Sequence, residues 1–187
     1  MAGLSCVTAG NGSSASGDGL VPAANAWRHF RVNRTKGSYQ LTDDKRRFDL
    51  RAIHRLLSDT YWAADRPRAA MKAAIDHSVC VGLFHEGEQV GFARAVTDHA
   101  TFTWICDVII HPRHRGKGLG KWLVEYLVNH PRLQTRSQVL ATRDAHGLYE
   151  RFSFTRTECM KRRLDTYTRT VRKNGGVARN RRKSTTR

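Results

Sequence analysis

Acidic residues are scarce in this chain of 187 residues, which has 16 Asp and Glu against 33 Lys and Arg. Cysteine is scarce too: Cys6, Cys80, Cys106 and Cys159 are the four present, and no two form a C-x-x-C pair. This spacing argues against a metal site, and the apolar runs around Cys80 and Cys106 are typical of buried, reduced thiols. No apolar run approaches the roughly 20 residues of a membrane-spanning helix, so we expect no membrane partner.

The first 36 residues also lack an apolar period. They are rich in Gly, Ala, Ser and Asn, and we expect residues 1–36 to form a disordered extension. They contain no charged segment followed by an apolar one, so we expect no secretion and a location in the cytoplasm or the nucleus.

The positive charge gathers at the other end. Residues 161–187 carry eleven Lys or Arg and one acidic residue, which is +10 of the total of +17. We expect residues 37–160 to form the folded domain and residues 161–187 a basic, largely disordered tail. The run at 179–183 reads RNRRK, a composition that serves nuclear import or contacts phosphates. A nucleic-acid partner bound through the tail is therefore one hypothesis, and an inert solvated tail is the alternative.

Between these ends, the apolar periods predict the order of the elements. Leu50, Ile53 and Leu57 are spaced as on one helix face, and short β-branched and aromatic runs separated by turns predict antiparallel strands. Asp144 is expected to N-cap the last helix. The expected strands are 38–41, 78–85, 90–97, 101–110, 137–142 and 154–159, and the expected helices are 48–57, 66–76, 118–129 and 144–152.

A glycine-rich turn after the longest strand carries the chemistry. The segment 107–120 reads DVIIHPRHRGKGLG and predicts a strand, a turn and a helix start. Glycines allow close approach of a ligand, and the first N–H groups of a helix attract anions. With Arg113, Arg115, Lys117 and Lys121 nearby, a pyrophosphate is the expected guest. A P-loop is excluded because Lys121-Trp122 follows the last glycine, and the G-x-G-x-G spacing does not match a dinucleotide fingerprint.

The residues 115–120, RGKGLG, match the R/Q-x-x-G-x-G/A signature of the GNAT acetyltransferases, and residues 148–154, LYERFSF, resemble the Y-x-x-x-G-F segment of that family. The resemblance covers about residues 38–160. It implies an α+β, three-layer fold with a mixed, mostly antiparallel central sheet flanked by helices. The family usually has Gly where this chain has Ser153, so a positive φ there would cost on the order of 1 kcal/mol.

The resemblance implies an acyltransferase that moves an acetyl group from acetyl-CoA to a primary amine by direct attack through a tetrahedral intermediate. The strand and the loop after it would bind coenzyme A, and a backbone N–H near Val108 or Ile109 would stabilise the oxyanion. The implied cofactor-binding residues are Val108, Ile109, Ile110, Arg115, Gly116, Lys117, Gly118, Leu119, Gly120 and Lys121.

Tyr149 matches the tyrosine that protonates the coenzyme A thiolate in many members of the family, and a half-buried structural role is the alternative. Asp107, on the cofactor strand, is a candidate base or amine holder, or else a structural charge at a strand bulge. His146 is a candidate base, or a structural histidine. Tyr61 and Trp62 lie where the family covers the acceptor, and either line it or pack the two helices together. Trp104 and Trp122 are expected in the core.

Two other functions stay open from the sequence: a catalytically weak acyl-CoA-binding module, and a nucleic-acid-associated protein that acts through its tail. An intact glycine loop and Tyr149 favour the enzyme. The acceptor is a small amine or a protein amine; its identity and the oligomeric state are not encoded in these motifs.

Overall fold

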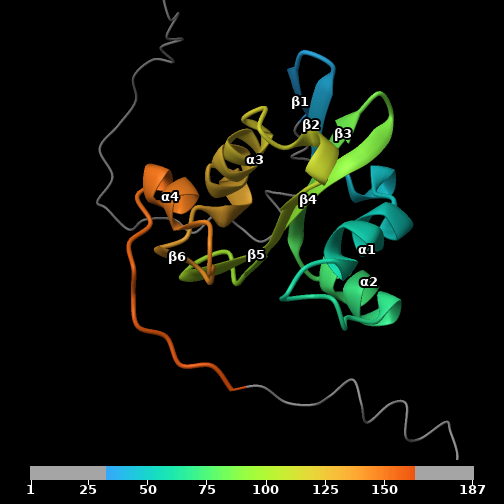
Figure 1. The fold of residues 1–187 in the computed structure, drawn as a ribbon. Helices are drawn as coiled ribbons and strands as arrows, with labels where there is room; N and C mark the ends of the chain where they lie inside the picture. The colour runs from blue at the N-terminus through green and yellow to red at the C-terminus, as the bar shows by residue number, and fades with distance from the viewer. Residues whose placement is uncertain (1–32, 163–187) are drawn as a thin grey trace, which may run out of the picture.

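The structure is a computed structural model that describes residues 33–162, and the expected extension and tail lie almost wholly outside that range. One six-stranded sheet runs through it in the order β1-β2-β3-β4-β5-β6 (Figure 1). Neighbouring strands are antiparallel except β5 and β6, which are parallel. The strands are β1 (Asn33–Lys36), β2 (Tyr39–Thr42), β3 (Val79–His85), β4 (Glu88–Thr97), β5 (Phe102–Ile110) and β6 (Ser137–Leu140).

The α-helices cover both faces of the sheet and make three layers (Figure 1). Short 3₁₀ turns connect several elements. The helices are α1 (Leu50–Ser58), α2 (Arg68–Asp76), α3 (Leu119–Val128) and α4 (His146–Tyr149), and the 3₁₀ turns are η1 (Lys45–Arg47), η2 (Pro112–His114), η3 (Pro131–Leu133) and η4 (Glu150–Phe152). The α+β class and the mixed, mostly antiparallel sheet expected from the sequence are confirmed.

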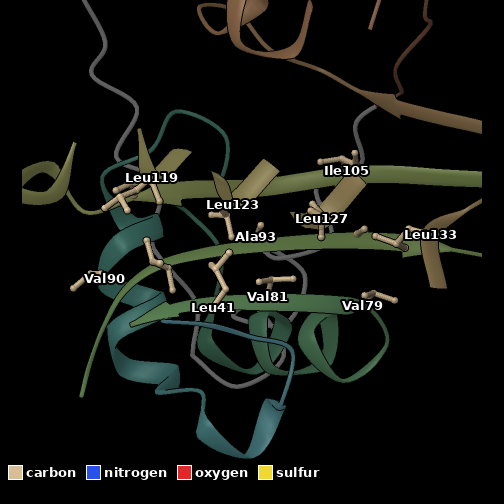
Figure 2. Packing of buried hydrophobic residues seen from close by; sticks show 13 residues of the cluster. Leu41, Val79, Val81, Val90, Ala93, Ile105, Leu119, Leu123, Leu127 and Leu133 are labelled. Atoms are coloured by element: carbon tan, nitrogen blue, oxygen red, sulfur yellow. The ribbon is translucent and has the colours of Figure 1, made fainter. Parts of the chain in front are cut away.

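Strand alternation divides the core between the two faces. Val79, Val81 and Leu83 of β3 join the cluster under α3, whereas Cys80 joins the cluster under α1 and α2. This is the period of two that a strand imposes on its side chains. Figure 2 shows the first cluster, in which Leu123 and Leu127 of α3 lie above the strands. No helix of residues 33–162 is long and apolar enough to cross a membrane.

Strand β5 changes face at a bulge. Ile105 and Ile110 both belong to the cluster under α3, although their positions differ by an odd number, and Ile109 belongs to the opposite cluster. The pairing of β4 with β5 shifts register between Phe92 and Arg94. Asp107 lies opposite this shift with a φ of +54°, a conformation that Asp tolerates better than most residues.

Strand β5 pairs with β6 along only about half of its length. β6 pairs with β5 only from Phe102 to Ile105. Beyond Ile105, no strand of residues 33–162 pairs with the edge of β5 that faces away from β4, and this edge is open as far as Ile110. The splay between β5 and β6 creates the space in which the candidate site lies.

Three local expectations need correction. The predicted strand 154–159 is not formed: the residues after Phe154 are exposed, and a cavity separates them from β6, so no ladder can form. Asp144 does not cap α4; the N-cap is Ala145, and its N–H is bound by the Thr142 hydroxyl at 3.1 Å. The predicted extension, residues 1–36, overlaps strand β1 in its last four residues.

Ser153 has a φ of +63°, the left-handed conformation anticipated from the glycine usual at this place. Replacing Ser153 by Gly removes the clash of Cβ with the backbone, partly offset by the greater freedom of Gly in the unfolded chain. We expect Ser153→Gly to raise the free energy of unfolding by about 0.5–1 kcal/mol in urea titrations. Ser137→Gly, in β6, serves as the control and should lower it; a loss of stability in Ser153→Gly would contradict the strain.

Candidate active site

The glycine loop forms an anion cradle at the N-terminus of α3. Gly116 and Gly118 have φ of +76° and +72°, and Gly118 is the N-cap of the helix. A Cβ at Gly116 would meet no atom within 4 Å, so the backbone conformation, not crowding, calls for glycine there. The N–H groups of the first turn of α3 point out of the helix without intrahelical acceptors. Such a terminus binds phosphate groups.

Basic side chains surround this cradle. Arg113, Lys117 and Lys121 are exposed. The Arg115 Nε donates to the carbonyl oxygen of Ile110 at 3.0 Å, which ties the loop to the end of β5. The predicted residues 115–121 therefore continue directly from the open edge of β5, where Val108 and Ile110 lie.

Tyr39, in β2, contacts two residues of the loop that forms the cradle. Its hydroxyl lies 3.2 Å from the Lys117 Nζ, which donates to it, and 3.0 Å from the Nδ1 of His114. Burial, with help from the charges of His85 and Lys117, lowers the pKa of His114, so its ring stays neutral at pH 7. Sequence reasoning missed Tyr39 because it belongs to no motif and its distance from the loop in sequence is large.

A cavity of about 390 Å³ opens where β5 and β6 separate. It brings together five residues singled out from the sequence, on three different segments, which are Tyr61, Trp62, Asp107, Val108 and Tyr149. Trp104 also lines this cavity, so the expectation that it belongs to the core was wrong. The reason is that the Trp104 side chain lies against this cavity instead of a packed helix, which a strand pattern alone does not reveal.

Tyr149 is the buried phenol of this cavity. Only 8% of the residue is exposed, and its hydroxyl makes no hydrogen bond within residues 33–162. Burial, with smaller contributions from Tyr61 and Asp144, raises the pKa of Tyr149 to about 12. The hydroxyl is therefore protonated at neutral pH and available as a donor.

His146 lies on the other side of Tyr149. It lines a neighbouring cavity of about 350 Å³ together with Phe154 and Thr155, and it is not among the residues of the 390 Å³ cavity. Tyr149 borders both cavities. Of the three residues predicted to be catalytic, Tyr149 and Asp107 thus share one cavity and His146 is separate from it.

Tyr61 links the α1–α2 loop to the segment after β6. Its hydroxyl accepts a hydrogen bond from the backbone N–H of Arg143 at 3.2 Å, and the Arg143 guanidinium lies 3.5 Å from the centre of its ring. The ring of Trp62 meets that of Tyr61 edge-on at 4.8 Å between centroids. Both aromatic residues are partly exposed, so they form a wall of the cavity and do not merely pack the helices together.

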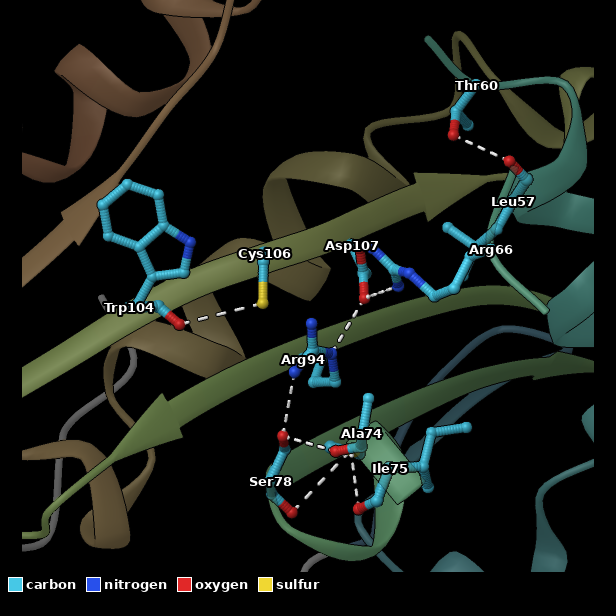
Figure 3. Close-up of polar contacts among 11 residues, drawn as sticks. Leu57, Thr60, Arg66, Ala74, Ile75, Ser78, Arg94, Trp104, Cys106 and Asp107 are labelled. Carbon is cyan, nitrogen blue, oxygen red and sulfur yellow. Dashed lines mark hydrogen bonds and ion pairs between the residues drawn. The ribbon is translucent and has the colours of Figure 1, made fainter. Parts of the chain in front are cut away.

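The carboxylate of Asp107 is enclosed by two guanidinium groups (Figure 3). Arg66 binds it with two N–H groups, at 2.6 and 3.1 Å, and the Arg94 Nε donates at 2.8 Å. Arg94 also donates to the Ser78 hydroxyl at 3.0 Å. Burial alone would raise the pKa of Asp107, but the two guanidinium groups outweigh it and hold the pKa below its ordinary value. Such a carboxylate is a weak base, which favours the structural role left open above.

Among residues 33–162, no group of three or more His, Cys, Asp or Glu is arranged to hold a metal ion. Cys106 borders the cavity, and burial raises the pKa of its thiol to about 11, so it is not a ready nucleophile. The chemistry open to this site is therefore that of an anion cradle, a buried phenol and an unpaired strand edge.

We expect Asp107→Asn to lower the free energy of unfolding by about 3 kcal/mol, because two buried guanidinium groups would lose their counter-charge. Urea titrations at pH 7 measure this change. The pKa of Asp107 is lower in the folded chain than in the unfolded chain. Its contribution to the free energy of unfolding is therefore complete above the unfolded pKa, and it is lost as the pH falls through the folded pKa. The difference between wild type and Asp107→Asn should therefore shrink below about pH 4; a difference independent of pH would contradict the ion cluster.

Comparison with known proteins agrees with this geometry. The model of the acetyltransferase (GNAT) family matches residues 50–154. A solved structure of a GNAT-family protein from Xanthomonas campestris is 45% identical, with a TM-score of 0.65 over 67% of this chain and 93% of that one.

Two curated relatives are similar over shorter regions. A protein of Gibberella zeae, an acetyltransferase by name, is 34% identical over 51% of this chain and 65% of its own length. An N-acetyltransferase of Gracilaria tenuistipitata is 36% identical over 46% of this chain and 50% of its own. The chain thus spans about half to two thirds of these relatives. With more than half of its length matched by the family model, the chain belongs to the GNAT family of acetyltransferases.

Proposed function

We propose that this protein is an N-acetyltransferase that moves the acetyl group of acetyl-CoA to a primary amine. The observation that carries the proposal is the position of Tyr149: a protonated, unpartnered phenol on the cavity beside the open edge of β5. The anion cradle follows the end of this strand, so a ligand with a phosphate end and a reactive end can lie along one path.

The residues of that path fit coenzyme A. The amides at the start of α3 and the charges of Arg113, Lys117 and Lys121 suit its pyrophosphate. The open edge of β5 suits the amides of its pantetheine arm. The N–H of His111 donates to Val90 on β4 at 2.8 Å. Because backbone groups alternate sides along a strand, the N–H groups of Ile110 and Val108 point to the open edge.

Val108 is also the best oxyanion donor, because it lines the cavity and its N–H faces away from β4. The amine nitrogen attacks the carbonyl carbon of the thioester, and negative charge develops on the carbonyl oxygen, where this N–H can stabilise it. As the tetrahedral intermediate collapses, the carbon–sulfur bond breaks. The sulfur leaves with the electron pair and takes the proton of Tyr149.

The group that takes up the proton of the acceptor amine has still to be identified. Asp107 is held ionised by Arg66 and Arg94, and we assign it the positioning of the bulge, not proton transfer. We give His146 no part in proton transfer, because it lines the neighbouring cavity. The attacking group is then a neutral amine, which loses its extra proton to solvent after the bond forms, and solvent returns a proton to the Tyr149 phenolate.

The basic run at residues 179–183 lies outside the described residues, as do Cys6 and most of the expected tail. Binding of nucleic acid through the tail, the disordered ends and a cytoplasmic or nuclear location stay predictions. No contact within residues 33–162 favours them over the acetyltransferase.

We expect Tyr149→Phe to lower kcat about 100-fold, in line with the loss of a general acid, and to leave the Kd for acetyl-CoA within twofold. Tyr126→Phe is the matched control, because the Tyr126 hydroxyl is buried without a hydrogen-bond partner among residues 33–162 and lies at a different cavity, beside α3. Release of free thiol and calorimetry measure the two quantities. Unchanged turnover in Tyr149→Phe would remove Tyr149 from the mechanism.

Binding of acetyl-CoA can be tested through the cradle. Gly118→Ala forces an L-residue into a φ of +72° at the helix N-cap, and we expect at least a tenfold weaker Kd in calorimetric titrations because the first amides of α3 turn away. Gly37→Ala imposes a comparable strain, at a φ of +57°, on the β1–β2 turn and should bind normally. Equal Kd values for both variants would show that the phosphate groups bind elsewhere.

A further inference from the structure

The charges of the 390 Å³ cavity identify the class of acceptor, given the proposed acetyl transfer. Four cationic side chains line it, from Arg66, Arg94, Arg143 and Lys161, against two carboxylates, from Asp107 and Asp144. A cavity with this excess disfavours an ammonium ion and favours a ligand that brings a negative charge. This cavity is therefore unsuited to an acceptor whose only charged group is its ammonium.

Neither carboxylate forms a buried binding site for an ammonium group. All three hydrogen bonds of Asp107 come from Arg66 and Arg94, so this buried cluster as a whole carries a charge of +1. Asp144 is exposed to solvent, as Arg143 is, but no ring stack orders its carboxylate as Tyr61 orders the Arg143 guanidinium, so its pairing with an ammonium contributes little. The acceptor amine next to the cluster is therefore stabilised in its neutral form, which is the form that attacks a thioester.

Arg143 is prepared for an anion. Its guanidinium is stacked on the ring of Tyr61 at 3.5 Å, and within residues 33–162 no carboxylate lies within salt-bridge distance of it. Stacking fixes the plane of the group and leaves its N–H edge free. That edge matches a carboxylate with two parallel hydrogen bonds.

This guanidinium is also close to the reacting centre. Tyr61, Arg143 and Tyr149 line the same cavity, and Tyr61 contacts Arg143 through both its ring and its hydroxyl. One side chain therefore separates the anion site from the proposed acid. A carboxylate on the carbon that bears the amine would reach Arg143 while the amine faces the thioester.

The other residues that line the cavity indicate what kind of side chain the acceptor has. Tyr61, Trp62 and Trp104 present aromatic surface, and the volume of about 390 Å³ lies near the lower limit of small-molecule sites. We propose that the acceptor is a free α-amino acid with an apolar or aromatic side chain, whose carboxylate is bound by Arg143. This inference rests on the acetyl transfer proposed above.

Pairs of acceptors that differ only in the carboxylate test it. With the full chain and acetyl-CoA, we compare phenylalanine with phenethylamine and tryptophan with tryptamine. We expect kcat/KM to be at least about tenfold higher for the amino acid of each pair, the effect of one strong charge-assisted interaction. Arg143→Gln should abolish this preference, and Arg143→Lys should restore part of it.

Arg151→Gln is the control, because Arg151 is an exposed arginine of η4 that does not line the cavity, and it should keep the wild-type preference. If the role of Arg143 were purely structural, Arg143→Gln would lower kcat/KM equally for the amino acid and for its decarboxylated amine. The ratio of the two kcat/KM values therefore distinguishes a structural role from carboxylate binding. A higher rate with the decarboxylated amines, or a preference that survives Arg143→Gln, would overturn the inference.

The two proposals can fail separately. If acetyl-CoA binds in calorimetry and other amines are acetylated but amino acids are not, the acceptor class is wrong and the acetyl transfer stands. If acetyl-CoA does not bind, the acetyl transfer itself is wrong. If it binds and no amine in a broad panel releases thiol, the protein is a binding module and both proposals fall.

Discussion

The buried contact of Asp107 with Arg66 and Arg94 holds the two halves of the site together. It lies at the bulge of β5 and joins three segments: the α1–α2 loop, β4 and β5. Removing two cations and one anion from water is unfavourable unless each is paired, and here the carboxylate accepts three hydrogen bonds. The geometry of the bulge is therefore fixed by electrostatics and not by the intrinsic preference of the strand.

Fixing the bulge has consequences on both sides of the strand. Past Ile105 the edge of β5 has no partner, and the amides of Val108 and Ile110 become available to a ligand. The α1–α2 loop, anchored through Arg66, places Tyr61 and Trp62 over the opening. Residues 111–115 connect the end of β5 to the cradle at Gly116 and Gly118, so the two parts of the proposed cofactor path follow each other in the chain.

The environment of each ionisable group then suits its proposed task. Burial keeps the phenol of Tyr149 protonated, with a pKa of about 12, while the neighbouring guanidinium groups keep Asp107 ionised. One cavity thus contains a proton donor and a carboxylate that stays ionised at neutral pH. The excess of positive charge and the free edge of Arg143 complete a site that suits a neutral amine next to a carboxylate.

The sequence by itself determined the order of the elements from β2 to α4, the glycine loop and the choice of Tyr149 as the candidate acid. Each depends on a local feature: periods of two and 3.6, the spacing of the glycines, and the family resemblance of residues 148–154. The left-handed Ser153 could be anticipated in the same way. Long-range packing decided the rest. Asp107 is ion-paired because Arg66, 41 residues away in sequence, reaches it, and Trp104 lines the cavity because its side chain lies where β5 and β6 separate. The failure of residues 154–159 to form a strand and the stacking of Arg143 on Tyr61 likewise depend on which surfaces meet in space, and no local pattern encodes that.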